Sequence, residues 1–240
     1  IALIVTGDEL QTPGEALSFG QVYESNSQLL QSALQWLRFS QVEIHYAKDD
    51  LASLTKTLAA ALSAADMVLL TGGVSVGDYD FVPKAAAAAG VEAIFHKIKQ
   101  KPGKPLFFGV KHGVADAKSD VGTTSQTVVF GLPGNPASVL TCFYQYVTVA
   151  LEQLTGTPVA PVACRAQIQS GYSKPIGLTH FLKADLQLPK DERAPIAVFV
   201  MGAQESFRLS SFAVSNAIIE IPAETTTVEK GDWVTVYPIG

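Results

Sequence analysis

Acidic side chains gather at three points in the first eighty residues, and each group follows an apolar run that is typical of a buried strand. The three groups are Asp8 with Glu9, Asp49 with Asp50, and Asp78 with Asp80. If the strands are parallel, their carboxyl ends share one edge of the sheet, and the three groups meet on one rim. Crowded carboxylates repel each other unless a cation joins them. The alternative is that these carboxylates cap helices, a role for which Asp50 is well placed.

A glycine-rich turn covers residues 71–83, directly after the apolar run that ends at Leu70. Gly72, Gly73 and Gly77 would let backbone N–H groups approach an anion, and the helix that follows adds partial positive charge at its N-terminus. A phosphate cradle with carboxylates beside it predicts a bridging Mg²⁺. A tight turn with solvated aspartates is the simpler alternative.

The same turn contains the letters of a nucleophile elbow, G-x-S-x-G, with Ser75 at its centre. The sequence offers Ser75 no evident Asp or His partner, and five residues separate it from the next expected helix. A serine hydrolase is therefore disfavoured.

Four lysines fall within eight residues. They are Lys97, Lys99, Lys101 and Lys104. Pro102, Gly103 and Pro105 lie around the last two of them, and the prolines restrict the backbone there. A stiff lysine loop suits an oxyanion, although a run of charges more often marks a solvated edge. A second stiff turn, residues 131–136, carries Pro133 and Pro136 and precedes a long expected helix.

The histidines and cysteines give weaker indications. His45, His96, His112 and His180 share no ligand spacing, so each is expected to be structural or solvated. Cys142 lies among apolar residues and is expected to be buried and inert.

Strands and helices alternate strictly through the first part of the chain, which predicts a three-layer α/β fold with a mainly parallel sheet. Ser25 or Asn26 is expected to cap the first helix, and residues 11–24 are expected to form a loop. Beyond residue 156 the apolar period changes to two, which predicts a small all-β barrel or sandwich. The predicted domains are residues 1–156 and 157–240.

The composition narrows the class of protein. The chain has 240 residues, 48% of them hydrophobic, and a net charge of −5, which argues against a nucleic-acid or membrane-surface partner. Two cysteines without ligand spacing favour a reducing, cytoplasmic compartment, and no apolar run is long enough to span a membrane. Because a core strand begins at Ile1, the chain is expected to be a piece of a longer protein.

Four motifs in this order resemble the molybdopterin molybdotransferase family, the MoeA proteins and the gephyrin E-domain. They are Thr6–Leu10, Gly72–Gly77 with Asp80, Lys101–Pro105 and Gly131–Pro136. The resemblance covers the whole chain. It implies a molybdopterin-binding, MogA-like domain over 1–156, a C-terminal β-barrel domain over 157–240, and Mg²⁺-dependent insertion of molybdate into adenylylated molybdopterin with release of AMP. It also implies a homodimer when the protein is full length, and a MogA-type adenylyltransferase as a possible partner.

The resemblance also assigns roles by position. The catalytic residues would be Glu9, Asp80, Lys97 and Lys101, and the metal ligands would be Glu9 and Asp80. The residues that bind molybdopterin, nucleotide or molybdate would be Asp50, Gly72, Gly73, Ser75, Gly77, Lys104, Pro133, Gly134, Asn135, Pro136, Lys183 and Ser206.

Two positions depart from the family's pattern. Lys183 stands where the family often has Arg, and a lysine offers a point charge in place of a bidentate fork. Glu205 stands where glycine is usual, and its carboxylate would repel molybdate. Two other functions stay open: a scaffold that holds molybdopterin without turnover, and a dinucleotide hydrolase like the competence-damage-inducible proteins, which lack the lysine and proline motifs.

Overall fold

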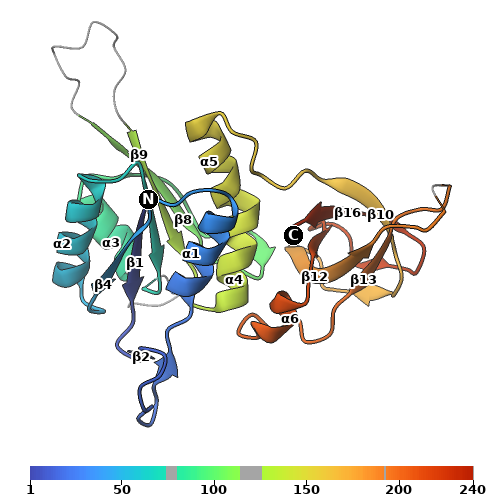
Figure 1. Cartoon of the computed structure of the whole chain (residues 1–240), viewed down its shortest axis with the longest axis horizontal. Helices are drawn as coiled ribbons and strands as arrows, with labels where there is room; N and C mark the ends of the chain where they lie inside the picture. The colour runs from blue at the N-terminus through green and yellow to red at the C-terminus, as the bar shows by residue number, and fades with distance from the viewer. Residues whose placement is uncertain (74–79, 114–125, 192, 240) are drawn as a thin grey trace, which may run out of the picture. The chain divides into compact units, whose positions relative to one another are not determined.

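The computed structural model describes residues 1–73, 80–113, 126–191 and 193–239. Its contacts divide the chain into two compact units (Figure 1). Unit 1 comprises Ile1–Ile98 and Pro105–Gly134, and unit 2 comprises Lys99–Lys104 and Asn135–Gly240. No helix in the part of the chain that the structure describes is long and apolar enough to cross a membrane.

Unit 1 is built on a six-stranded sheet. In order across the sheet, the strands are β4 (Glu43–Ala47), β1 (Ala2–Thr6), β5 (Met67–Thr71), β9 (Gln126–Leu132), β8 (Phe107–His112) and β6 (Glu92–His96). The first four are mutually parallel, whereas β8 runs antiparallel to both of its neighbours. No helix crosses over between β6 and β8, and antiparallel neighbours need none. The predicted mainly parallel sheet is confirmed.

Helices cover both faces of this sheet and complete the three predicted layers (Figure 1). Helices α2 (Leu51–Leu62) and α3 (Phe81–Ala88) share one apolar core with β1 and β5, and α1 (Asn26–Trp36) lies on the other face. All five residues of β1 and of β5 are buried, as expected for central strands.

The segment expected as a loop over 11–24 contains two short strands, β2 (Leu10–Gln11) and β3 (Val22–Tyr23), which pair in parallel. The expected cap of α1 is also wrong. Ser25 makes no capping bond to that helix, and the Glu24 carboxylate accepts the Ser27 N–H at 2.9 Å instead. Asn26 turns its amide to the Gly134 carbonyl, 2.8 Å away.

Unit 2 contains a closed five-stranded barrel, as predicted. Its strands are β10 (Cys164–Ile168), β16 (Trp233–Pro238), β14 (Ala217–Ile221), β12 (Thr179–Gln187) and β13 (Ala197–Val200), and pairing of β13 with both β10 and β12 closes the ring. The short strand β7 (Gln100–Lys101) adds to β12. A small ribbon, β11 (Tyr172–Ser173) with β15 (Thr227–Val228), and helix α6 (Ser210–Ala213) complete the barrel region.

A long helical segment also belongs to unit 2. It runs through α4 (Pro136–Cys142), a π-helical turn η1 (Phe143–Val147) and α5 (Thr148–Thr155). The contacts within the chain thus group residues 99–104 and 135–156 with the barrel. The domain boundary between residues 156 and 157 stays a prediction.

Candidate functional site: an acidic rim on the first sheet

The carboxyl ends of β4, β1 and β5 lie at one edge of the unit 1 sheet. In the strand register Thr6 pairs with Ala47, and Val5 pairs with Thr71. The Asp49 N–H donates to Asp8 Oδ1 across 3.3 Å, so the first two acidic groups do meet on one rim. We call this edge, with Asp8, Glu9, Asp49, Asp50 and Asp80, the acidic rim.

Asp49 lies in an electrostatic environment that disfavours its charged form. Burial raises its pKa above the ordinary value, the carboxylates of Asp8 and Glu9 raise it further, and the nearby Thr6 hydroxyl acts in the opposite direction. Its Oδ1 is buried and makes no hydrogen bond within the described residues. Such an oxygen is costly to leave unpaired, and a cation would relieve both the burial and the repulsion.

Asp50 behaves differently from its neighbour. Its Oδ1 accepts the Ser53 N–H at 2.8 Å and caps α2, as the capping alternative predicted. Sequence reasoning grouped the two aspartates and assigned the ligand role to Asp50. Asp49, however, is the one whose buried oxygen lacks a hydrogen bond within the described residues.

The glycine turn after β5 approaches β1 at close range. Gly72 has φ +84°, and a Cβ there would lie 2.0 Å from the Thr6 carbonyl oxygen, so only glycine fits. Gly73 has φ +63°, and its ideal Cβ position lies 3.8 Å from Asp49 Oδ1. The turn therefore brings backbone to the carboxylate. Ser75, Gly77 and Asp78 lie outside the described residues.

Asp80 is buried and precedes α3 as its N-cap residue. Its side chain makes no capping bond to α3, and Pro83, at the third helical position, has no N–H to donate. Asp80 Oδ2 instead lies 3.1 Å from Nε2 of His96, the last residue of β6. Sequence reasoning missed this pair, because it treated each histidine as solvated or structural.

Lys97 follows His96 directly and is exposed. Its backbone adopts φ +67°, a left-handed conformation that is rare for lysine, and its N–H donates to the Leu106 carbonyl at 2.9 Å. Lys97, which is predicted to bind an oxyanion, is therefore the chain neighbour of His96, which lies close to Asp80.

The remaining lysines of the motif, Lys99, Lys101 and Lys104, belong to unit 2 and are exposed. Their loop is held by Gln100, whose side chain donates to the Pro102 carbonyl at 2.9 Å and accepts a hydrogen bond from the Tyr146 hydroxyl. Gly103 packs so closely on α4 that a Cβ would lie 2.5 Å from Cys142 Sγ. Cys142 is fully buried, as expected, and burial raises the pKa of its thiol.

The turn over residues 131–136, which carries Pro133 and Pro136, contributes residues to both units. Asn26 holds the Gly134 carbonyl in unit 1, and Pro136 opens α4 in unit 2. Asn135 Nδ2 donates to Ser206 Oγ at 2.9 Å, which brings together two residues that were predicted separately as ligand-binding.

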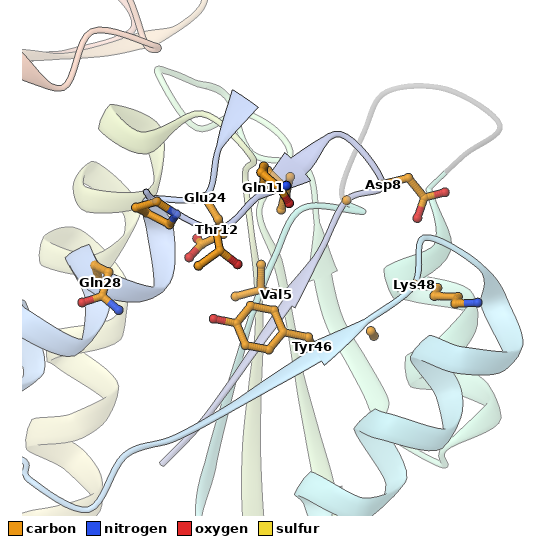
Figure 2. Close-up of a pocket in the computed structure, with 12 residues that line it drawn as sticks. Val5, Asp8, Gln11, Thr12, Glu24, Gln28, Tyr46 and Lys48 are labelled. Carbon is orange, nitrogen blue, oxygen red and sulfur yellow. The ribbon is translucent and has the colours of Figure 1, made fainter. Parts of the chain in front are cut away.

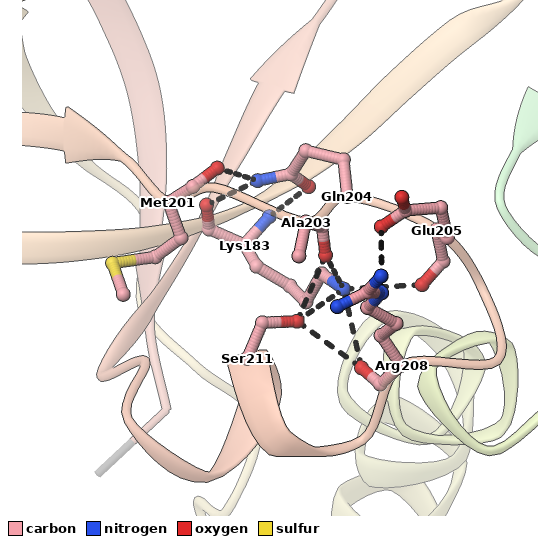
Figure 3. Close-up of polar contacts among 7 residues, drawn as sticks. All are labelled: Lys183, Met201, Ala203, Gln204, Glu205, Arg208 and Ser211. Atoms are coloured by element: carbon pink, nitrogen blue, oxygen red, sulfur yellow. Dashed lines mark hydrogen bonds and ion pairs between the residues drawn. The ribbon is translucent and has the colours of Figure 1, made fainter.

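Lys183 is almost wholly buried in the barrel unit, with 5% of its surface exposed. Its ammonium lies near the carbonyls of Ala203, Glu205 and Arg208, at 2.7, 3.2 and 3.3 Å, and near the Ser211 hydroxyl, at 2.6 Å (Figure 3). Burial lowers its pKa. The Glu205 carboxylate, which was expected to repel molybdate, lies 3.5 Å from Arg208 Nε.

A pocket of about 400 Å³ opens beside the acidic rim (Figure 2). Asp8 and Lys48 lie at one end of it in this view, and Tyr46 and Gln28 lie farther along. The lining combines one aromatic ring with amide, hydroxyl and charged groups.

Among the described residues, no three His, Cys, Asp or Glu side chains are close enough to hold a metal by themselves. Mg²⁺ does not require such a cage, because it is usually bound by one or two carboxylates, with waters and substrate phosphates completing its shell. The buried oxygen of Asp49 and the crowded rim therefore fit a Mg²⁺ that protein and substrate hold together.

The six-stranded sheet with helices on both faces and the closed five-stranded barrel define an α/β unit and a β-barrel unit in one chain. The chain belongs to the family described as probable molybdopterin binding domain, which matches residues 2–153. Residues 165–239 match the MoeA C-terminal region, domain IV.

The curated relatives bear a consistent name. The molybdopterin molybdenumtransferase of Haemophilus influenzae is 32% identical over 99% of this chain, and that of Synechocystis is 29% identical over 99%. A MoeA protein of Pyrococcus horikoshii OT3, known from its crystal structure, is 26% identical with a TM-score of 0.73 over 99% of this chain and 52% of its own. The chain spans 55% of the length of the two curated relatives.

Proposed function

We propose that the chain carries the molybdopterin-binding and metal-binding machinery of a molybdotransferase. The reaction would be Mg²⁺-dependent insertion of molybdate into adenylylated molybdopterin, with release of AMP. The observation that carries the proposal is the buried Oδ1 of Asp49, which makes no hydrogen bond within the described residues and lies on a rim of carboxylates beside Gly73. A rim that needs a cation, next to backbone that can approach phosphate, suits a pyrophosphate substrate.

The residues would divide the work by their chemistry. Glu9 and Asp80, with Asp49 beside them, would hold Mg²⁺. When bound, the metal would neutralise charge on the phosphate oxygens and so ease cleavage of the pyrophosphate. The glycine turn would orient the phosphates through its N–H groups, and Lys97, Lys101 and Lys104 would bind the oxyanion. Pro133 and Pro136 would shape the nucleotide loop.

The test measures AMP release from adenylylated molybdopterin with molybdate and Mg²⁺. We expect Asp80→Asn to stay folded and to lose about 100-fold in rate, as removal of one electrostatic group in an active site commonly does. Glu92→Gln is the matched control, because Glu92 lies at the opposite end of β6 and its side chain is exposed.

A rate for Asp80→Asn equal to that of the unaltered protein would remove Asp80 from the mechanism. Tight binding of adenylylated molybdopterin without any AMP release would favour the scaffold function instead.

A further inference from the structure

The lysine loop, which we define as residues 99–104, alternates exposed charges with buried residues. Lys99, Lys101 and Lys104 are exposed, whereas Gln100 and Gly103 are buried. Gln100 has only 2% of its surface accessible, which is unusual for a polar side chain. The buried residues restrain the backbone of the loop, and the lysine side chains between them remain in solvent.

The barrel holds the start of the loop through backbone contacts. Strand β7 runs parallel to β12, with Gln100 paired to Thr179 and Lys101 paired to His180. The Thr179 N–H donates to the Lys99 carbonyl at 3.0 Å. These contacts involve the backbone alone, so they do not require a glutamine at position 100.

The Gln100 amide joins the end of the loop to the helical segment of unit 2. Its Nε2 donates to the Pro102 carbonyl at 2.9 Å, and its Oε1 accepts a hydrogen bond from the Tyr146 hydroxyl. A carbonyl can only accept, so Nε2 must face Pro102, Oε1 must face Tyr146, and the hydroxyl must be the donor. Burial raises the pKa of Tyr146 to about 12, which keeps its proton in place at neutral pH. Tyr146 thus orients Gln100, and Gln100 holds Pro102.

The helical segment makes a second contact with the loop, one residue farther along. Gly103 has φ +89°, and a Cβ there would lie 2.5 Å from Cys142 Sγ and 2.8 Å from Gln100 Nε2. The Cys142 thiol donates to the Gly103 carbonyl across 3.8 Å. Residues 102 and 103, which separate Lys101 from Lys104, are therefore held on both sides by buried groups.

We propose that Gln100 is a positioning residue, which together with Tyr146 holds the lysine loop in the conformation that binds molybdate. This inference rests on the proposed function, in which Lys101 and Lys104 bind the oxyanion. A loop that is already held in its bound conformation loses less conformational freedom on binding, so its affinity is higher. Gln100 and Tyr146 would act through the loop backbone, with no contact of their own to the anion.

The experiment is a calorimetric titration of the whole chain with molybdate alone, with thermal unfolding of each variant measured in parallel. Gln100→Met keeps the length of the side chain but removes both polar atoms. Tyr146→Phe removes only the hydroxyl, so it covers the case in which Gln100→Met does not fold. The two changes combined close a double-mutant cycle, and Lys101→Ala tests whether the loop itself binds the anion.

Tyr237→Phe is the matched control. Tyr237 belongs to the same unit and is half-buried like Tyr146, but its hydroxyl donates to Glu220 at 2.7 Å. Its loss should leave molybdate affinity unchanged, even where it lowers the melting temperature. The control therefore separates a general loss of stability in unit 2 from a loss of order in the lysine loop.

We expect about a 5-fold weaker molybdate affinity in Gln100→Met and about a 3-fold weaker affinity in Tyr146→Phe. Because Tyr146 acts through Gln100, the double variant should bind molybdate as weakly as Gln100→Met alone. Two independent contributions would multiply instead, and that result would overturn the link from Tyr146 through Gln100.

The remaining outcomes separate this inference from the proposed function. Equal affinities in the folded Gln100 and Tyr146 variants, beside a loss in Lys101→Ala, would overturn the positioning role and leave the oxyanion role of the loop standing. A loss in Tyr237→Phe as large as that in Tyr146→Phe would also overturn the positioning role. An unaltered protein that binds no molybdate, or a Lys101→Ala variant that binds it equally well, would overturn both.

Discussion

Asp49 in unit 1 and Lys183 in unit 2 both place charged atoms out of water, but their surroundings differ. Lys183 directs its ammonium to four oxygen acceptors within its own unit. Asp49 has a buried oxygen that makes no hydrogen bond within the described residues, and the nearby carboxylates of Asp8 and Glu9 repel its charge. Within the part of the chain that the structure describes, the charge of Lys183 is compensated and that of Asp49 is not.

This difference separates a charge that the fold itself stabilises from a charge that a bound cation would stabilise. A compensated ammonium can reach molybdate only after it leaves four contacts, whereas an uncompensated carboxylate gains by meeting a cation. The prediction that Lys183 binds an anion therefore has to overcome a cost that the rim carboxylates do not face. The ion pair of Glu205 with Arg208 likewise gives that carboxylate a partner of its own.

The largest expected effect comes from removing the compensated charge. Lys183→Met keeps much of the volume but leaves three carbonyls and the Ser211 hydroxyl without the ammonium, which should cost about 3 kcal/mol of unfolding free energy. Chemical denaturation measures it. Lys190→Met, at an exposed position, is the control and should stay within about 0.5 kcal/mol. A loss below about 1 kcal/mol would show that the four contacts contribute little.

Adding Mg²⁺ should have a smaller, opposite effect. At ten times its dissociation constant, Mg²⁺ should stabilise the folded chain by about 1.4 kcal/mol. Asp49→Asn should reduce the stabilisation by Mg²⁺. Lys183→Met should lower the unfolding free energy without Mg²⁺ but leave the stabilisation by Mg²⁺ unchanged. Denaturation with and without Mg²⁺ decides it, and equal gains in Asp49→Asn and the unaltered protein would remove Asp49 from the metal site.

The pH dependence of Asp49→Asn gives a third test, without Mg²⁺. Because the folded-state pKa of Asp49 is raised, its charged form costs stability at neutral pH, and the Asn variant should be more stable there. The folded state binds the proton more tightly than the unfolded one. The advantage of Asn is therefore fully present above the raised pKa and is lost as the pH falls towards the ordinary value of 3.8. An advantage that does not change with pH would contradict this origin.

The acidic rim could be predicted because local patterns were enough. Apolar runs located the strands, parallel pairing placed their ends together, and Gly72 marked a close approach of backbone. The contact of Asp80 with His96 could not be predicted, because it depends on the order of strands across the sheet. That order is set by packing over the whole unit.

The burial of Lys183 was hidden for a similar reason. The period of two makes every second residue of β12 appear exposed, but the structure buries five consecutive residues, His180–Ala184. One face of the strand lines the barrel core, and the residues around 203–211 supply partners on the other. Two-sided burial of a barrel strand follows from tertiary contacts, which alternation alone does not reveal.

The smallest expected effect concerns Asp50, whose charge the fold also employs, as a helix cap. Its Oδ1 accepts the Ser53 N–H, a bond that Asn can make equally well, so Asp50→Asn should change the unfolding free energy by only a few tenths of a kcal/mol. Asp50→Ala removes the acceptor and should cost about 1 kcal/mol. Denaturation of both variants measures the difference. If Asp50 bound the cation, as is proposed for the rim around Asp49, Asp50→Asn would instead weaken Mg²⁺ binding while stability stayed constant. Unchanged Mg²⁺ affinity in Asp50→Asn, beside a clear loss in Asp49→Asn, would assign capping to one aspartate and metal binding to its neighbour.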